Sequence, residues 1–268
     1  MNESAPPRRL AVGQLERVLR ARRDRGGHSL VIYLTGGFPG WQDMVRAAVA
    51  AGADAVEVGI PFSDPVMDGP VIQEASEVAL RAGATPPGVL AEIANLDIGV
   101  PVAVMTYYNL VFRFGLERFA STAAEVGVSA AILPDLPLDE AGPWCDEADA
   151  AGIETVMLAA PTGSDERLGR VCDRSRGFVY GVGLLGVTGE RTSLAASATE
   201  IATRLKRITD RPVLVGVGVS TPEQAVQTCR VADGVVVGSA VVRRMVEGAG
   251  PEGVGDLVGE FRRAIDAI

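Results

Sequence analysis

The sequence predicts a (β/α)8 barrel, also called a TIM barrel, in which eight parallel strands close inside a ring of helices. Short apolar runs rich in β-formers alternate with amphipathic helical patterns along the whole chain, which is typical of βα units around a parallel sheet. A chain of 268 residues with 47% hydrophobic content also suffices for one barrel domain. We therefore expect a single α/β domain over residues 1–268, with residues 1–8 as a disordered tail.

The alternation predicts eight strands and the helices between them. The strands are Leu30–Leu34, Ala53–Val58, Val102–Met105, Ala130–Leu133, Glu154–Leu158, Phe178–Val182, Val213–Val217 and Gly234–Val237. An extra N-terminal helix runs from Val12 to Arg23, and Gly255–Ile268 closes the chain. Ser220–Glu223 has the spacing of a helix capping box, with Pro222 in the first turn. The active site of such a barrel lies at the carboxyl ends of its strands.

One predicted strand carries a carboxylate where an apolar residue is expected. Alternation places Glu57 on the strand face of Ala55 and Gly59, opposite the two neighbouring valines. A buried unpaired carboxylate costs several kcal/mol, so Glu57 needs a partner, water in a cleft, or a raised pKa suited to proton transfer. A structural Glu satisfied by a neighbouring strand is the alternative. Asp68, in the Pro/Gly-rich loop that follows, is the second candidate of an acid–base pair, although Asp-Gly is also an ordinary turn former.

Further polar residues fall at or near the predicted strand ends. Tyr107 follows the third strand, Asp135 follows the fourth, and Tyr180 lies in the sixth. They converge with Glu57 and Asp68 on one mouth of the barrel. The two tyrosines are equally interpretable as packing aromatics.

Two glycine-bearing turns after the last two strands predict a phosphate site. Gly216–Ser220 follows the seventh strand, and Gly238-Ser239 follows the eighth at the start of a short helix. Glycines permit close backbone approach, and the N–H groups of the helix start, with the Ser239 hydroxyl, supply donors to a dianion. The long glycine-bearing loop 183–193 is consistent with a lid that excludes water.

Composition disfavours several other classes of protein. A net charge of −9 argues against a nucleic-acid partner. The beginning of the chain lacks an apolar leader and no run approaches the roughly 18 apolar residues of a membrane span, so we expect a cytoplasmic protein. The three cysteines are scattered and read as buried free thiols. The only lysine, Lys206, lies in a helical stretch, and the only histidine, His28, lies in a loop where we expect it to be exposed. Because a Schiff base needs a lysine, a hydrolytic triad usually needs a histidine and a zinc site needs several His or Cys ligands, the sequence argues against all three kinds of chemistry.

The motifs together resemble the family of tryptophan synthase α subunits over nearly the whole chain. The segment VEVGIPFSDPVMDGP (56–70) is similar to the family's second-strand signature. Further blocks match in order, namely MTYYN (105–109), PDLP (134–137), GVTG (186–189) and GS (238–239). The resemblance implies reversible cleavage of indole-3-glycerol phosphate into indole and glyceraldehyde 3-phosphate. It also implies no cofactor in this chain and an α2β2 assembly with a β subunit that carries pyridoxal phosphate and receives the indole.

The resemblance also implies roles for individual residues. Glu57 is the general acid at indole C3 and then the base for the glycerol hydroxyl, and Asp68 holds the indole N–H. The remaining matches are substrate-binding positions, namely Tyr107, Tyr180, Thr188, Gly189, Val217, Gly218, Gly238 and Ser239, and partner-interface positions, namely Pro61, Asp64 and Asn109. No metal site is implied.

The chain departs from the family pattern at five positions. They are Phe38, Gly181, Gly183, Leu184 and Val217, of which Val217 stands where a Phe usually packs against indole. The glycines of the sixth strand put lid closure and signalling between subunits in doubt. Two alternatives to the α-subunit interpretation stay open, namely a stand-alone indole-3-glycerol phosphate lyase and a non-catalytic activator of a β subunit.

Overall fold

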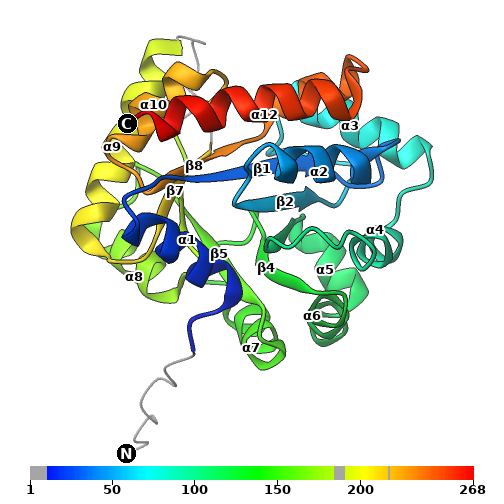
Figure 1. Cartoon of the computed structure of the whole chain (residues 1–268). Coiled ribbons are helices and arrows are strands. Elements are labelled where there is room, and N and C mark those ends of the chain that lie inside the picture. Colours follow the sequence, from blue (N-terminus) through cyan, green and yellow to red (C-terminus); the bar gives the residue numbers. More distant parts are fainter. Residues whose placement is uncertain (1–10, 184–190, 217) are drawn as a thin grey trace, which may run out of the picture.

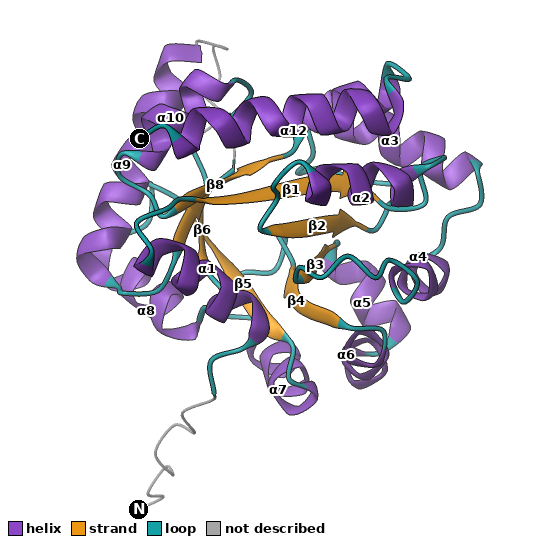
Figure 2. Ribbon diagram, in the orientation of Figure 1, coloured by secondary structure: helices purple, strands orange, loops and turns teal. Residues whose placement is uncertain are grey.

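Eight parallel strands close into a barrel in the computed structural model, which describes residues 11–183, 191–216 and 218–268. Each strand pairs with the next one along the chain, and β8 pairs with β1 (Figure 2). The strands are β1 Ser29–Thr35, β2 Ala55–Gly59, β3 Val102–Met105, β4 Val128–Ile132, β5 Glu154–Ala159, β6 Val179–Gly181, β7 Val213–Val215 and β8 Gly234–Val237. The predicted (β/α)8 fold is therefore confirmed.

The helices of the described chain surround this barrel, most of them as a ring and α1 at one end (Figure 1). They are α1 Gln14–Asp24, α2 Trp41–Ala50, α3 Pro70–Arg81, α4 Pro86–Ile93, α5 Tyr108–Phe114, α6 Leu116–Glu125, α7 Gly142–Ala151, α8 Asp165–Arg174, α9 Arg191–Ile208, α10 Pro222–Cys229, α11 Ser239–Val246 and α12 Gly250–Asp266. The extra N-terminal helix and the closing helix are both present, the latter starting five residues earlier than predicted.

Strand boundaries differ from the predicted ones by up to two residues, and the capping box of α10 is shifted. The N-cap is Thr221, whose side chain accepts a hydrogen bond from the N–H of Gln224, while the Gln224 side chain accepts one from the Thr221 N–H. The predicted box had begun at Ser220 and used Glu223. Pro222 then becomes the first helical residue, where its missing N–H costs nothing.

The alternation of side chains separates two apolar clusters. One cluster joins the outer face of the strands to the helices and includes Val56 and Val58 of β2. The other fills the barrel interior and includes Ala55 of β2 together with Leu15 and Leu19 of α1. Because successive side chains of a strand point to opposite faces, Glu57 belongs to the interior layer, as predicted.

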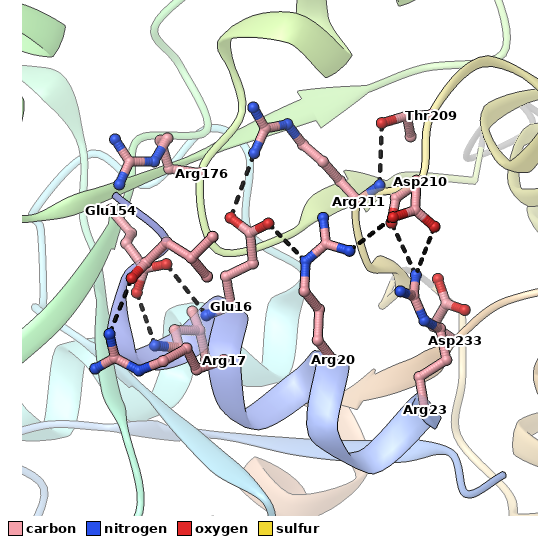
Figure 3. A network of polar contacts seen from close by, with 12 residues as sticks. Glu16, Arg17, Arg20, Arg23, Glu154, Arg176, Thr209, Asp210, Arg211 and Asp233 are labelled. Carbon is pink, nitrogen blue, oxygen red and sulfur yellow. Dashed lines mark hydrogen bonds and ion pairs between the residues drawn. The ribbon is translucent and has the colours of Figure 1, made fainter. Parts of the chain in front are cut away.

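Helix α1 covers the end of the barrel at which the strands begin, and a buried glutamate of β5 attaches it there (Figure 3). The Glu154 carboxylate accepts hydrogen bonds from the backbone N–H groups of Leu15, at 2.7 Å, and Glu16, at 3.1 Å. These groups belong to the first turn of α1, which has no side-chain cap of its own. A Cβ on Gly13 would lie 2.1 Å from Glu154 Cδ, so only glycine leaves room for this carboxylate cap.

Around this cap, buried and exposed charges are paired. Glu16, only 1% exposed, meets Arg20 at 2.8 Å and Arg211 at 3.3 Å. Lys206, the single lysine, lies 2.8 Å from Asp233, at the start of β8 and away from the mouth. His28 is half-buried, not exposed as predicted, and the side chains of Arg22 in α1 and Arg262 in α12 donate hydrogen bonds to its backbone carbonyl. The three cysteines are buried and free, as predicted.

None of the helices within the described residues is both long enough and apolar enough to span a bilayer.

Replacing Glu154 by Ala should lower the free energy of unfolding by about 2–4 kcal/mol, because two buried N–H groups of α1 lose their acceptor. Urea denaturation measures this change. The matched control is Glu77→Ala, which removes an exposed ion pair with Arg81 and should change the free energy by less than about 1 kcal/mol. Equal stability of Glu154→Ala and wild type would contradict the capping role.

Candidate acid–base site at the barrel mouth

Glu57 is fully buried in the barrel interior, with 0% of its surface exposed. It comes from the middle of β2, where it pairs in register with Tyr33 of β1 and Ala103 of β3. Neither carboxyl oxygen has a hydrogen-bond partner among the described residues. Burial therefore raises the pKa of Glu57 to about 8, because nothing compensates the lost hydration of its charged form. The alternative of a structural Glu held by a neighbouring strand finds no support in these contacts.

Asp68 lies in the loop between β2 and α3 and is half-buried. Burial raises the pKa of its carboxyl to about 6, and a hydrogen bond with the Tyr107 side chain opposes this rise. The surroundings of Asp68 are therefore less polar than the Pro/Gly-rich sequence of its loop suggested. Tyr107, the N-cap of α5, also accepts a hydrogen bond at its hydroxyl from the Met67 N–H, at 2.8 Å. Tyr107 thus fixes the loop that carries Asp68.

The two carboxyls are differently charged near neutral pH. Glu57, with a pKa of about 8, keeps its proton, whereas Asp68, with a pKa of about 6, is ionised. A protonated acid and an ionised carboxylate are the two groups required to protonate a substrate and to stabilise the cation that results.

Two tyrosines extend toward the mouth across neighbouring strand ends. Tyr180 of β6 is predicted from the sequence and is 7% exposed, and a Cβ on Gly216 would lie 2.1 Å from its hydroxyl. Tyr33 of β1 was not predicted, although it is also 7% exposed and a Cβ on Gly59 would lie 2.0 Å from its hydroxyl. Its signal was present in the sequence, because alternation in β1 puts Tyr33 on one face with Ser29 and Thr35.

A pocket beside Asp68 includes Tyr33, Thr106 and Tyr107 in its lining. Tyr33 and Tyr107 are therefore not only packing aromatics, whereas Tyr180 packs in the apolar cluster of the barrel interior. Asp135 also lies near this mouth, where its carboxylate accepts a hydrogen bond from the Tyr108 N–H at 2.8 Å and so holds the start of α5.

The glycine turns after β7 and β8 have the features predicted for a phosphate site. Gly218 adopts φ +90°, a left-handed conformation that favours glycine, and is exposed. Gly238 is the N-cap of α11, and Ser239 is the exposed first residue of that helix. The N–H groups of a first helical turn are available to an anion. Thr188, Gly189 and Val217, the other predicted substrate-binding positions of this region, lie outside the described residues.

Of the five departures from the family pattern, two can be placed in detail. Phe38, in the loop after β1, is 9% exposed and packs in the cluster between barrel and helices. A Cβ on Gly181 would lie 3.3 Å from Val215 Cγ2 and 3.5 Å from Ile201 Cγ2. Gly181 therefore faces α9 and allows it to pack closely, rather than facing the mouth. Gly183 is buried, and Leu184 lies outside the described residues, as does most of the predicted lid.

The predicted interface positions are only partly at the surface. Asp64 and Asn109 are exposed, whereas Pro61 is buried at the start of the loop that follows β2. Exposed apolar side chains that sequence reasoning missed lie beside them in the chain, namely Val66 at 82%, Met67 at 55% and Phe112 at 64% exposure. We call Asp64, Val66, Met67, Asn109 and Phe112 the rim surface. Large apolar side chains with more than half of their surface exposed are candidates for contact with another molecule.

A search of the described residues for three or more grouped His, Cys, Asp or Glu side chains able to hold a metal ion finds no such group.

Comparison with known proteins gives consistent matches over most of the chain. The family model of the tryptophan synthase alpha chain matches residues 19–256. The tryptophan synthase alpha chain of Streptomyces coelicolor is 44% identical over 94% of this chain and 96% of its own length. That of Methanosarcina mazei is 43% identical over 84% of each chain. A solved structure of Mycobacterium tuberculosis tryptophan synthase superposes with a TM-score of 0.88 at 38% identity, covering 95% of this chain and 99% of that one. Tryptophan synthase subunit alpha from Legionella pneumophila gives 0.87 at 32%, covering 96% and 100%.

The closed (β/α)8 barrel and the matches to known proteins define an enzyme of the carbon–carbon lyase class. The chain belongs to the tryptophan synthase alpha chain family. Its function lies in tryptophan biosynthesis, through the family's indole-3-glycerol phosphate lyase reaction. Alpha chains of this family do not themselves bind pyridoxal phosphate.

The variant Glu57→Gln should be more stable than wild type, by an amount that grows as pH rises. The folded pKa of Glu57, about 8, lies above the unfolded value of 4.5, so its stabilising contribution is complete below pH 4.5 and is lost by pH 8. The difference in free energy of unfolding should grow by on the order of 1 kcal/mol per pH unit inside this window. Urea denaturation from pH 5 to 8 measures it, with the exposed Glu77→Gln as control. A difference that does not change with pH would mean that Glu57 is ionised in the folded protein.

Proposed function

We propose that Glu57 and Asp68 divide the acid–base work of indole-3-glycerol phosphate cleavage. The observation that carries the proposal is the unpartnered, fully buried Glu57 carboxyl, with a pKa of about 8, at a mouth where Asp68 has a pKa of about 6. The acid and the anion are thus both in the correct state before substrate binds.

In the cleavage direction, Glu57 gives its proton to indole C3, the carbon that bears the glycerol phosphate chain. The ring becomes an indoleninium cation, and the Asp68 carboxylate stabilises it by accepting a hydrogen bond from the ring N–H. The Glu57 carboxylate then takes the proton of the hydroxyl on the adjacent carbon. The C–C bond breaks, its electrons return to the ring, and indole and glyceraldehyde 3-phosphate leave with Glu57 protonated again. The ring is the electron sink, so this route needs neither a Schiff base nor a metal.

The remaining predicted residues are proposed to bind the substrate. Tyr107, Tyr180 and Val217 would surround the indole ring, the first two from positions beside Asp68 and Glu57 respectively. The phosphate would lie between the turns after β7 and β8, held by Gly218, Gly238 and Ser239 with Thr188 and Gly189. Backbone N–H groups of α11 supply donors there without a lysine.

We further propose a tryptophan synthase β subunit as partner, in an α2β2 assembly in the cytoplasm, with pyridoxal phosphate on the β subunit. The exposed rim surface supports a partner, because it combines large apolar side chains with Asp64 and Asn109. This surface disfavours a stand-alone lyase, and the intact Glu57 and Asp68 disfavour a non-catalytic activator. The net charge of −9 disfavours a nucleic-acid partner, and we propose no membrane partner.

Glu57→Gln should lower kcat for indole-3-glycerol phosphate cleavage by on the order of 10²–10⁴, with KM within a few-fold of wild type. The amide keeps the shape of the side chain but carries no transferable proton. Steady-state assays of indole release measure both constants. Turnover near the wild-type value would remove Glu57 from the mechanism.

Addition of the cognate β subunit should raise the weak activity of the isolated chain at least about tenfold, which corresponds to about 1.4 kcal/mol in the barrier. The partner would shift the mouth toward its closed, competent state. Phe112→Asp should abolish this rise because it puts a charge in the rim surface. Ile208→Asp is the matched control, since Ile208 is also partly exposed but ends α9, outside the rim surface. Full activity alone, with no complex by sizing chromatography, would favour the stand-alone lyase.

A further inference from the structure

Tyr33 is a buried polar residue of the barrel mouth to which neither the acid–base pair nor the substrate contacts give a role. It pairs in register with Glu57 on the adjacent strand, and both side chains face the interior. Its hydroxyl lies over Gly59, where a Cβ would be 2.0 Å away. Gly59 is two residues beyond Glu57 on the same face of β2, so the phenol extends over the glutamate on its mouth side.

The hydroxyl also faces the second carboxyl. Tyr33 lines the pocket that contains Asp68, and the charges of Asp68 and Glu57 both act on it. The other groups that act on it are the Thr35 and Tyr107 hydroxyls, and Tyr180 faces it from β6. Burial raises the pKa of Tyr33 well above its ordinary value, so its O–H remains a donor at every working pH.

A phenylalanine would fill the same volume without burying a hydroxyl. A buried hydroxyl costs free energy unless it has a hydrogen-bond partner; Tyr33 has one in the Thr35 side chain, and the charges of two carboxyls also act on it. Glu57 has a complementary need. It has no partner among the described residues, yet the proposed reaction makes it an anion for part of each cycle.

We propose that Tyr33 is a positioning residue of the acid–base site, whose hydroxyl donates a hydrogen bond to the Glu57 carboxylate formed when Glu57 gives its proton to the substrate. The inference rests on the proposed function and deepens it. No bond of Tyr33 breaks, because its proton stays on the phenol oxygen throughout. The hydrogen bond lowers the free energy of the anionic form of Glu57 and holds the carboxylate toward the hydroxyl that it deprotonates next.

The test compares wild type with Tyr33→Phe, and uses Tyr108→Phe as matched control because Tyr108 lies in α5 outside the acid–base pair. Steady-state cleavage of indole-3-glycerol phosphate is measured from pH 6 to 10. Tyr33→Phe should lower kcat about tenfold with KM within twofold. Loss of a donor to the charged form raises the pKa of Glu57, so the fall of kcat at alkaline pH should move to higher pH. Tyr108→Phe should match wild type in all three readouts.

A second readout needs no turnover. The carboxyl C=O band of Glu57, assigned by infrared difference against Glu57→Gln, gives its titration midpoint in the substrate-free protein, and Tyr33→Phe should raise that midpoint. Gly59→Ala supplies a second variant, because its Cβ displaces the Tyr33 hydroxyl while keeping the phenol, and it should shift the midpoint likewise.

An unchanged titration midpoint of Glu57 in Tyr33→Phe would overturn the inference. A raised KM with an unchanged pH profile would also overturn it, because Tyr33 would then only line the substrate pocket. Wild-type protein without lyase activity would instead overturn the proposed function, and the infrared midpoint would still decide the contact between Tyr33 and Glu57. If Tyr33→Phe does not fold, Gly59→Ala decides in its place.

Discussion

The burial of an unpaired carboxyl inside the barrel is the constraint on which the rest of the site depends. Glu57 takes an interior position that alternation would give to an apolar residue, and no described group satisfies its oxygens. Its protonated form is therefore the stable one, and its pKa rises to about 8. The raised pKa lowers folding stability at neutral and alkaline pH, but it also provides an acid that still holds its proton when the substrate binds.

Glu57 and Glu154, the two buried glutamates of the barrel strands, have different roles because their surroundings differ. Glu154, at the start of β5, accepts two backbone hydrogen bonds from α1 and so holds this helix over the end of the barrel at which the strands begin. Glu57, in the middle of β2, has no such partners. Both are 0% exposed, so burial alone does not distinguish them. The difference lies in hydrogen bonding: burial raises the pKa of both carboxyls, but backbone hydrogen bonds oppose the rise at Glu154 and none opposes it at Glu57.

The fold and the buried interior position of Glu57 could be predicted from the sequence, because strand alternation and the strand–helix order are local patterns. What could not be predicted depends on contacts between distant segments. The sequence placed Asp68 in a polar loop, but Tyr107 and the barrel mouth enclose it enough to raise its pKa to about 6. Gly181 was expected to affect lid closure, whereas its missing side chain lets Ile201 of α9 approach. Tyr33 was overlooked because its position over Gly59 comes from the register between β1 and β2.

The central claim, that Glu57 moves a proton to and from indole C3, is tested most directly by hydrogen exchange at that carbon. Indole is incubated with the isolated chain in D2O at neutral pD, and the loss of the C3–H signal is followed by proton NMR. The account predicts that wild type accelerates this exchange over buffer and that Glu57→Gln returns it to the buffer rate. Equal exchange with wild type and Glu57→Gln would contradict the account.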